Sequence, residues 1–511
     1  MTPISLGQRV KDSNGFAATV RYIGPVSTSK DPSAVWIGVE FDDPTRGKHQ
    51  GPAVTAGEDG AEVYFHCQGG GSGSFLKPDK VDTGISLVQA LAQHYVELDA
   101  PLEAPGNVFE GSYAQTAKGG RKPIEFYGES KIRARQQVGE LEHITLRGMG
   151  VASAGETEAL AAAAGHFSQV DLTGNLLSSW VDVCSIAQQL PLLEVLNLTG
   201  NKLRAMAPNS IPPAMSPLTY PKLRTLVLNS CSLKGFSQVA QLVPNMPQLK
   251  ELYLADNDLS DLEMCSSLEG LAGLHVLDVS ECRICEWSQV AAFGSLPTLE
   301  VLSLNHNPLE AVTMEAGGAP QAFPSLHTVS LVGTKISSWH SVEQVGELPA
   351  LTNLRFAACP LSSQMSSTEA RAIILGRLPK LRRVNGSDVS SKERVEAEKT
   401  YLRMVLREMK GREEGEQLVS EIRQVHPRYN ALLALYGDCV RPGVASNGGT
   451  GTLASDMISV SLCSMASGSC TAEPTCKKLP GSLPIKRLKV LCKQLFKLDI
   501  DLQVKLLARN A

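Results

Sequence analysis

Residues 193–203 read LEVLNLTGNKL, and residues 299–309 repeat the same pattern as LEVLSLNHNPL. Both stretches follow L-x-x-L-x-L-x-x-(N/C)-x-L, and related copies return at intervals of 25 to 30 residues. The first residues of the copies are Leu141, Phe167, Leu193, Leu223, Leu249, Leu274, Leu299, Leu326 and Leu351. A pattern that returns at this period predicts a stack of repeats rather than a single globular core.

Each copy predicts a short parallel strand whose leucines point inward, followed by a turn in which a buried Asn satisfies backbone groups. Cys takes the place of Asn in three copies, at Cys231, Cys282 and Cys359. Because one unit buries its apolar face only against its neighbours, the copies must stack. We therefore expect an α/β leucine-rich-repeat solenoid of about nine repeats over residues 131–389.

The segments that return between the strands also repeat, and each is a short amphipathic stretch ending in Leu-Pro or Met-Pro. The aromatic residues that open them are Trp180, Phe236, Trp287 and Trp339. Their spacing predicts convex helices of about ten residues. The outward positions of the strands form the concave face and include Asp171, Tyr253, Asp278 and Arg355. Of these, Tyr253 and Arg355 are our candidates for protein contacts.

A helical cap is expected after the last repeat, because a solenoid needs its ends covered. Ser390-x-x-Glu393 has the spacing of a capping box and opens a charged stretch that runs to about Lys410. We assign residues 390–440 to this C-terminal cap and a helical segment. Residues 441–451 are rich in Gly, Ser and Pro, which is typical of a linker.

The N-terminal part follows a different pattern. Residues 1–82 alternate apolar and polar positions between Gly, Pro and Asp, which predicts a small antiparallel β module. From Thr83 to Ala117 the chain has four acidic residues and neither Lys nor Arg. We therefore expect an acidic linker over residues 83–130.

The C-terminal end is basic, and residues 476–511 contain nine Lys or Arg against two Asp. Ile458-x-Val460-x-Leu462 alternates as a strand does, and helical spacing of Ile and Leu begins at Ile485. This helix could lie on a membrane surface or on nucleic acid. We favour the alternative in which it crosses a small sheet, within a domain at 452–511.

The composition narrows the class of protein. The 511 residues carry a net charge of −4, which argues against nucleic acid as the main partner. We find no signal-peptide core and no apolar run of 18 residues, so we expect neither secretion nor a membrane span. Twelve Cys in a chain of this length suggest reduced thiols in the cytoplasm.

Four short motifs in the first 82 residues occur in a specific order. They are Trp36-Ile37-Gly38-Val39-Glu40-Phe41, Gly47-Lys48-His49-Gln50-Gly51, Tyr64-Phe65-x-Cys67 and Gly73-Ser74-Phe75-Leu76-Lys77-Pro78. Together they resemble the CAP-Gly domain, a small β barrel. The resemblance implies a site for acidic peptides ending in Glu-Glu-Tyr, such as the α-tubulin tail.

The roles that this resemblance implies fit the residue types. Gly47 and Gly51 let the tail approach the backbone, and Lys48 donates to the terminal carboxylate. His49 and Gln50 fill the polar signature positions, where Gln50 replaces the usual Asp. The tail's aromatic ring rests on Trp36 and Phe75, and Lys77 supplies a second cation. The simpler alternatives are that Trp36 and Phe75 only pack in the core and that Lys48 is an idle surface lysine.

The order of the parts resembles the tubulin-binding cofactor E family over nearly the whole chain. Additional matching motifs are Phe126-Tyr127-Gly128 and His426-Pro427-Arg428-Tyr429. In that family the C-terminus is a ubiquitin-like (β-grasp) domain, of which residues 452–511 match only the first part. The resemblance implies a cytoplasmic and cytoskeletal chaperone of post-chaperonin tubulin folding, which assembles and disassembles the αβ-tubulin heterodimer. Its implied partners are α-tubulin (tail and folded body), sibling cofactors with β-tubulin, and ubiquitin or proteasome machinery.

Two other functions fit the sequence less well. A CAP-Gly anchor or plus-end protein of microtubules usually has basic flanks, whereas residues 1–82 carry eight Lys or Arg against ten Asp or Glu. A cysteine-dependent enzyme of ubiquitin chemistry needs a catalytic motif, and we find none. Cys282-x-x-Cys285 has metal spacing but no second ligand pair, and Gly69–Gly73 lacks the context of a phosphate loop. We expect no catalysis, no cofactor and no metal.

Overall fold

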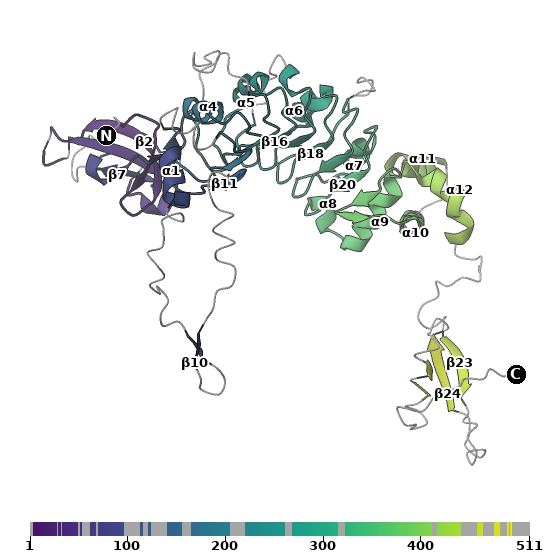
Figure 1. The fold of residues 1–511 in the computed structure, drawn as a ribbon. Helices are drawn as coiled ribbons and strands as arrows, with labels where there is room; N and C mark the ends of the chain where they lie inside the picture. The colour runs from purple at the N-terminus through teal and green to yellow at the C-terminus, as the bar shows by residue number, and fades with distance from the viewer. Residues whose placement is uncertain are drawn as a thin grey trace. The chain divides into compact units, whose positions relative to one another are not determined.

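The computed structural model of the chain divides into two compact units, residues 1–428 and residues 429–511. The structure describes residues 4–27, 29–31, 33–49, 52–53, 62–67, 70–96, 113–115, 121–123, 141–155, 165–204, 220–260, 268–314, 322–410, 416–440, 457–462, 475–480, 488–489 and 491–492. Figure 1 labels its elements. Within those ranges no helix is both long and apolar enough to cross a membrane.

An antiparallel five-stranded sheet with the strand order β6-β3-β2-β1-β7 forms the N-terminal barrel. The bounds of its elements are β1 (Arg9–Asp12), β2 (Ala17–Pro25), β3 (Val35–Phe41), η1 (Pro44–Arg46), β4 (Pro52–Ala53), β5 (Glu62–Val63), β6 (Gly73–Leu76), η2 (Pro78–Lys80) and β7 (Val81–Asp82). Its own small core consists of Val10, Ala18, Val20, Ile37, Val39 and Phe41. The antiparallel β module predicted for this part of the chain is therefore present.

Directly after the barrel, the structure differs from the expected linker. β8 (Ile85–Ser86) pairs in parallel with β12 (Val151–Ser153), and α1 (Leu87–Leu91) continues as a π-helix, η3 (Ala92–Val96). The buried side chains Leu87, Ala90, Leu91 and Tyr95 belong to the core of the solenoid. This segment folds because its apolar side chains cover the open end of the first repeat. Farther on, β9 (Tyr113–Gln115) and β10 (Arg121–Pro123) form an antiparallel pair.

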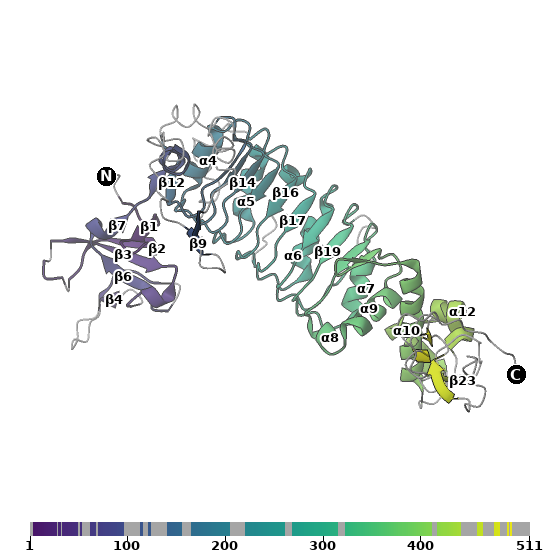
Figure 2. The same ribbon diagram turned by 60° about the horizontal axis from the view of Figure 1, so that its bottom comes forward.

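The solenoid sheet has eleven strands in chain order, β11, β13 to β22, and all neighbours are parallel except β21 and β22. The strands are β11 (His143–Thr145), β13 (Gln169–Asp171), β14 (Val195–Asn197), β15 (Thr225–Val227), β16 (Glu251–Tyr253), β17 (Val276–Asp278), β18 (Val301–Ser303), β19 (Thr328–Ser330), β20 (Asn353–Arg355), β21 (Arg383–Val384) and β22 (Ser387–Asp388). Figure 2 shows β14 to β19 side by side. In register, Leu196 aligns with Leu226 and Leu252, so one buried residue per strand builds a continuous core.

In the repeats that carry a buried Asn, its side chain ties neighbouring turns together, as predicted. Asn201 donates from Nδ2 to the carbonyl oxygens of Leu172 and Leu198, each at 2.9 Å, and accepts from the Leu177 amide. At the Cys positions the thiol makes one of these bonds. Cys282 Sγ donates to the Leu254 carbonyl at 3.1 Å. Burial raises the pKa of this thiol to about 12, so it stays protonated.

Helices lie on the side of the solenoid opposite its strands, where Figure 1 shows α4, α5 and α6. Their bounds are α4 (Trp180–Gln188), α5 (Ser237–Leu242), α6 (Trp287–Ala291) and α7 (Trp339–Gly346). α4 and α7 approach the expected ten residues, but α5 and α6 are shorter and pass into the 3-10 turns η6 (Val243–Asn245) and η8 (Ala292–Ser295). A further 3-10 turn, η7 (Glu269–Leu271), precedes β17.

Four helices cover the C-terminal end of the solenoid. They are α8 (Pro360–Ser363), α9 (Ser367–Arg377), α10 (Ser391–Met409) and α11 (Glu416–Val425). α10 begins and ends where the sequence predicted, with Ser390 accepting from the Glu393 amide at its N-terminus. The Glu393 side chain, however, binds Arg371 of α9 instead of completing a capping box.

The second unit contains α12 (Tyr429–Val440) and an antiparallel hairpin of β23 (Met457–Leu462) and β24 (Thr475–Pro480). The strand predicted from the alternation at Ile458 to Leu462 is thus confirmed. The helix predicted from Ile485 onward is described only at residues 488–489 and 491–492, which are helical. The predicted linker at 441–451 lies outside the described residues.

Candidate functional site

One face of the barrel sheet carries the motif residues, because side chains alternate along β3. Ile37, Val39 and Phe41 point into the core, so Gly38 and Glu40 belong to the opposite face. A Cβ added to Gly38 would lie 2.5 Å from the Phe65 ring and 2.9 Å from the Tyr22 Cβ. Glycine at this position therefore makes room for aromatic side chains above the sheet.

Those side chains form an aromatic cluster, which we define as Tyr22, His49, Tyr64, Phe65 and Phe75. Phe75 is at its centre, with ring centroids 5.1 Å from His49, 5.6 Å from Tyr64, 5.5 Å from Phe65 and 6.3 Å from Tyr22. Phe65 is buried, whereas Phe75 is only half-buried. The cluster thus presents a partly open apolar surface of the kind that accepts another aromatic ring.

Trp36 lies on the same face of β3, two residues from Gly38, and is half-buried. Its indole Nε1 donates to Ser29 Oγ at 3.1 Å. Lys77 follows β6 directly, two residues after Phe75, and is exposed. Both residues were expected at the site, and both lie at the edge of this face.

The signature loop is attached to β6 by its backbone. The amides of Lys48 and His49 both donate to the Gly73 carbonyl, at 2.7 and 3.2 Å, and Gly73 donates back to His49 at 2.8 Å. A Cβ added to Gly47 would lie 2.0 Å from the Gly71 carbonyl oxygen, so packing within the barrel itself requires glycine there. Gln50 and Gly51 lie outside the described residues.

The two titratable residues of this loop differ in environment. The Lys48 side chain is exposed. Burial, together with the neighbouring charge of Lys48, lowers the pKa of His49 below its usual value. A neutral imidazole beside Phe75 and an exposed ammonium next to it can receive an aromatic residue that carries a carboxylate.

Sequence reasoning missed part of the cluster. Tyr64 and Phe65 were recognised only as a motif and not as site residues, and Tyr22 was not singled out at all. The order of the motifs could have indicated the first two, because motifs that recur together often line one site. No sequence pattern identifies Tyr22, which joins the cluster only through the pairing of β2 with β3.

On the solenoid, Tyr253 and Arg355 occupy the same row of outward positions, on β16 and β20. Tyr253 is half-buried and donates from its hydroxyl to Glu251 Oε2 at 3.2 Å, while Arg355 is exposed. Four strand steps of about 4.8 Å separate them, or roughly 19 Å. The structure therefore puts both on one face without bringing them together.

Cys282 and Cys285 do not form a pair of ligands in this fold. Cys282 is buried in the turn ladder and Cys285 is exposed. Among the residues that the structure describes, no group of three or more His, Cys, Asp or Glu could hold a metal ion.

Comparisons with known proteins find similarities in the N-terminal part and over nearly the whole chain. The CAP-Gly domain family matches residues 6–81. Tubulin-folding cofactor E of Arabidopsis thaliana is 31% identical over 96% of this chain and 90% of its own length. Tubulin-specific chaperone E of Danio rerio is 33% identical over 97% and 91%, and that of Homo sapiens 31% over 98% and 92%. A solved CAP-Gly domain, that of Bik1 with a peptide from Bim1, covers 15% of this chain at 25% identity and a TM-score of 0.12.

Similarity at this level extends through both the barrel and the repeats and leaves few residues of either chain unmatched. By sequence, the chain belongs to the tubulin-specific chaperone E family, also called tubulin-folding cofactor E.

Proposed function

We propose that this protein is a tubulin-folding cofactor, which binds α-tubulin and takes part in the assembly and disassembly of the αβ-tubulin heterodimer. The observation that carries the proposal is the similarity, over at least 96% of the chain, to proteins named for tubulin folding. It acts in the cytoplasm and at the cytoskeleton as a binding protein and not as an enzyme.

The aromatic cluster is the site proposed for the C-terminal residue of the α-tubulin tail. An aromatic side chain at the end of the tail packs against Phe75, with Trp36 at the edge of the same face. Lys48 binds the terminal carboxylate, and Lys77 binds an acidic side chain before it. Gly47, His49, Gln50 and Gly51 shape the loop that carries Lys48.

The outward row of the solenoid is proposed to hold the folded body of α-tubulin, with Tyr253 and Arg355 as contacts. A tail alone cannot select one subunit, because every α-tubulin on a microtubule presents the same tail. A second weak site on the same chain raises the effective affinity by about 10²–10⁴. Sibling cofactors bring β-tubulin to the α-tubulin that this protein holds. The C-terminal unit, which we propose is ubiquitin-like, binds ubiquitin or proteasome machinery.

The decisive experiment compares capture of soluble αβ-tubulin with binding to polymerised microtubules by the purified full chain. We expect a preference for soluble tubulin and release or assembly of heterodimers. Equal or stronger decoration of microtubules favours a microtubule anchor instead and contradicts the proposal.

A pair of variants tests the role of the outward row. Tyr253→Glu with Arg355→Glu should abolish activity on heterodimers while leaving binding of a tail peptide intact. The control is Gln248→Glu with Lys250→Glu, which makes the same change in charge at exposed positions before β16. Equal activity of the two double variants would exclude this row as the tubulin contact.

A further inference from the structure

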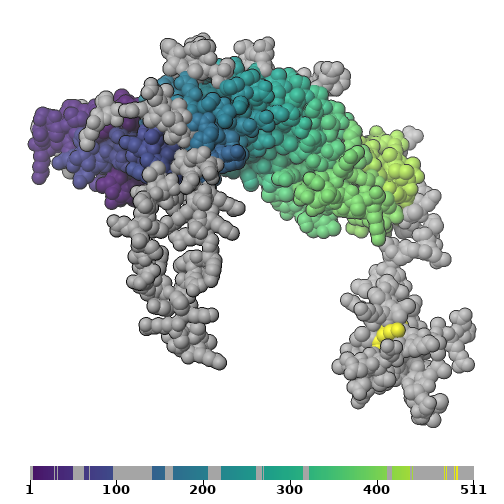
Figure 3. Space-filling view, in the orientation of Figure 1, coloured from purple at the N-terminus to yellow at the C-terminus, as the bar shows by residue number. Residues whose placement is uncertain are grey.

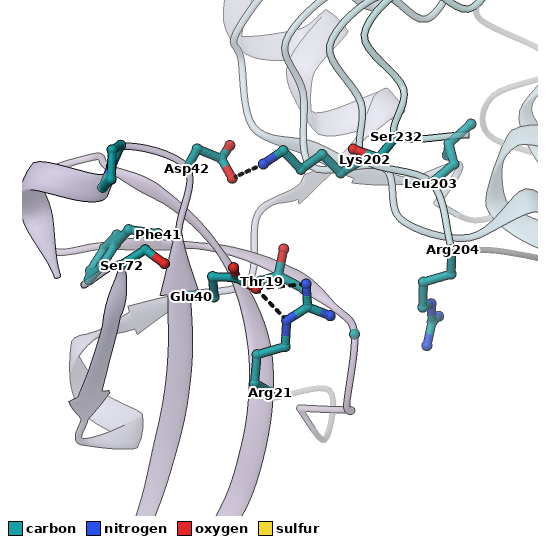
Figure 4. Close-up of a pocket in the computed structure, with 12 residues that line it drawn as sticks. Thr19, Arg21, Glu40, Phe41, Asp42, Ser72, Lys202, Leu203, Arg204 and Ser232 are labelled. Atoms are coloured by element: carbon teal, nitrogen blue, oxygen red, sulfur yellow. Dashed lines mark hydrogen bonds and ion pairs between the residues drawn. The ribbon is translucent and has the colours of Figure 1, made fainter. Parts of the chain in front are cut away.

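The barrel and the first repeats enclose a cleft of about 370 Å³. Figure 4 shows the residues that line it, with Arg21, Glu40 and Asp42 from the barrel facing Lys202 and Arg204 from the solenoid. We call this space the interdomain cleft. Lys202 Nζ lies 2.8 Å from Asp42 Oδ1 across it.

The residues that line the cleft include more cations than carboxylates, although residues 1–82 as a whole carry more acidic than basic residues. Arg21 is balanced by Glu40, at 2.8 Å. Asp42, however, is shared by two cations, Lys202 and the buried Arg9.

Arg204 is the third cation that lines the cleft, and it donates to the backbone carbonyls of Ser178 and Leu6. Asp182 of α4 is near enough to Arg204 to interact with its charge. Three cations, Arg21, Lys202 and Arg204, thus line the cleft against two carboxylates, Glu40 and Asp42. Lys202 retains 41% exposure of its side chain, so a further carboxylate can reach it.

Glu40, which lines the cleft, lies close to the aromatic cluster on the same face of the barrel sheet. Glu40 of β3 pairs with Gly73 of β6. Gly73 in turn lies next to His49, since a Cβ added to Gly73 would be 3.1 Å from His49 Nδ1 and 2.8 Å from Cys67 Sγ. His49 belongs to the cluster, and Glu40 lines the cleft. Gly38 lies beneath the cluster, and Asp42 lines the cleft four residues farther along the chain. In an extended strand, four residues correspond to about 13 Å between the cluster and the cleft.

The two walls of the cleft are held together by several contacts. Lys11 Nζ of the barrel donates to the Gly148 carbonyl at 3.1 Å, and Arg204 of the solenoid reaches the Leu6 carbonyl at 3.0 Å. Gly7 has a positive φ, and a Cβ there would lie 2.6 Å from the Arg204 side chain. The surfaces of the barrel and the first repeats meet in the space-filling view (Figure 3).

We propose that the interdomain cleft is a second subsite for an acidic peptide, which binds carboxylates upstream of the C-terminal residue held by the aromatic cluster. An extended peptide advances about 3.3 Å per residue, so the side chains four to six positions before its C-terminus reach Lys202 and Arg204. The solenoid thus adds two cations, Lys202 and Arg204, to a barrel in which acidic residues outnumber Lys and Arg. The inference rests on the proposed function, because it assumes that the cluster holds the end of the peptide.

The test uses the full chain and two synthetic peptides that both end in Glu-Glu-Tyr. One carries Glu and the other Gln at the positions four to six residues before the C-terminus. We expect calorimetry at low salt to show about 5- to 10-fold tighter binding of the Glu peptide, as two partly exposed ion pairs would provide. In 0.5 M salt the difference should disappear.

Lys202→Met with Arg204→Met should abolish the preference and leave binding of the Gln peptide unchanged. Lys335→Met is the matched control, because Lys335 occupies the same position of its repeat as Lys202 and is exposed. A preference that persists in the double variant overturns the inference. If the double variant does not fold, the measurement with the unaltered full chain still tests the inference. Equal affinity of that chain for both peptides at low salt overturns the inference as well.

Failure of the proposed function would look different. If neither peptide binds, or if removal of the terminal Tyr changes nothing, the aromatic cluster is not a tail site. If both peptides bind equally and need the terminal Tyr, the tail site stands and only the second subsite is lost.

Discussion

Asp42 of the barrel accepts from two cations at once, Arg9 beneath it and Lys202 of the solenoid. Arg9 is buried, with only 2% of its side chain exposed, and it also donates to Thr19 Oγ1 at 2.8 Å. Burial alone would raise the pKa of Asp42, but the hydrogen bonds from Arg9 and Lys202 lower it below its usual value. One carboxylate thus supports the barrel core and joins it to the first repeats.

Asp42→Ala should destabilise the barrel by about 2–3 kcal/mol, because it leaves the Arg9 guanidinium buried without its carboxylate. Lys202→Met should cost only about 0–1 kcal/mol, since its ion pair is partly exposed. Hydrogen exchange of the β1–β3 amides measures the local free energy of unfolding. Equal effects of the two variants would contradict this account.

Binding of a peptide ending in Glu-Glu-Tyr should depend on both an apolar and a charged contact. Phe75→Ala removes the centre of the aromatic cluster and should weaken binding by about 2–3 kcal/mol. Lys48→Ala should cost about 1 kcal/mol, because this lysine is exposed before the peptide binds. Calorimetry measures both affinities, and substitution of the exposed Lys80 by Ala is the control. Unchanged affinity in Phe75→Ala would show that the peptide does not bind at the aromatic cluster.

Truncation should be tolerated up to residue 82 but not up to residue 96. A chain starting at residue 83 keeps β8 and α1, which cover the first repeat. A chain starting at residue 97 loses the buried Leu87, Leu91 and Tyr95, at a cost of roughly 5 kcal/mol in apolar burial. Thermal unfolding and binding of a hydrophobic dye distinguish the two, and equal stability would mean that α1 does not act as a cap.

Stability should fall as the solution becomes more acidic than about pH 6.5, partly through His426. Burial and the charge of Arg377 lower the pKa of this histidine, although Glu408 opposes the change. His426 Nδ1 lies 3.1 Å from an Arg377 nitrogen and 2.8 Å from the Tyr401 hydroxyl, which suits a neutral ring that accepts.

The sign follows from linkage. Between an unfolded pKa of about 6.5 and the lower folded pKa, the unfolded state binds the extra proton, so falling pH favours unfolding by up to about 1.4 kcal/mol per pH unit. His426→Gln should flatten this slope between pH 5 and 6.5 in urea titrations. Substitution of the exposed His340 by Gln is the control. Identical slopes in the two variants would show that His426 does not cause the loss of stability at low pH.

Cys285→Ser should leave zinc content and tubulin binding unchanged. The Cys282 thiol is buried and protonated, whereas a metal ligand must be a thiolate. Elemental analysis of the purified full chain tests this, and stoichiometric zinc that disappears in the variant would show that the two cysteines bind metal.

Local pattern was sufficient to predict the repeats and the C-terminal cap. Each repeat buries its leucines against the next copy of itself, so the period, the inward Leu positions and the Asn or Cys of each turn are all visible along the chain. The start of α10 was predictable for a similar reason, because an N-cap involves only residues three apart. The ordered motifs of the barrel likewise predicted the loop at Lys48 and the aromatic position of Phe75.

Tertiary structure decided how the outward residues combine. No periodic pattern of the sequence predicts the contact of Tyr22 with Phe75 or that of Asp42 with Lys202. These contacts form only when separate strands or domains pack together. The segment at 85–96 was predicted as part of a linker because nothing local shows that its apolar residues pack against the open end of the first repeat. The sequence by itself therefore determined the repeating core, where every contact recurs, and only the folded molecule determined the contacts that occur once.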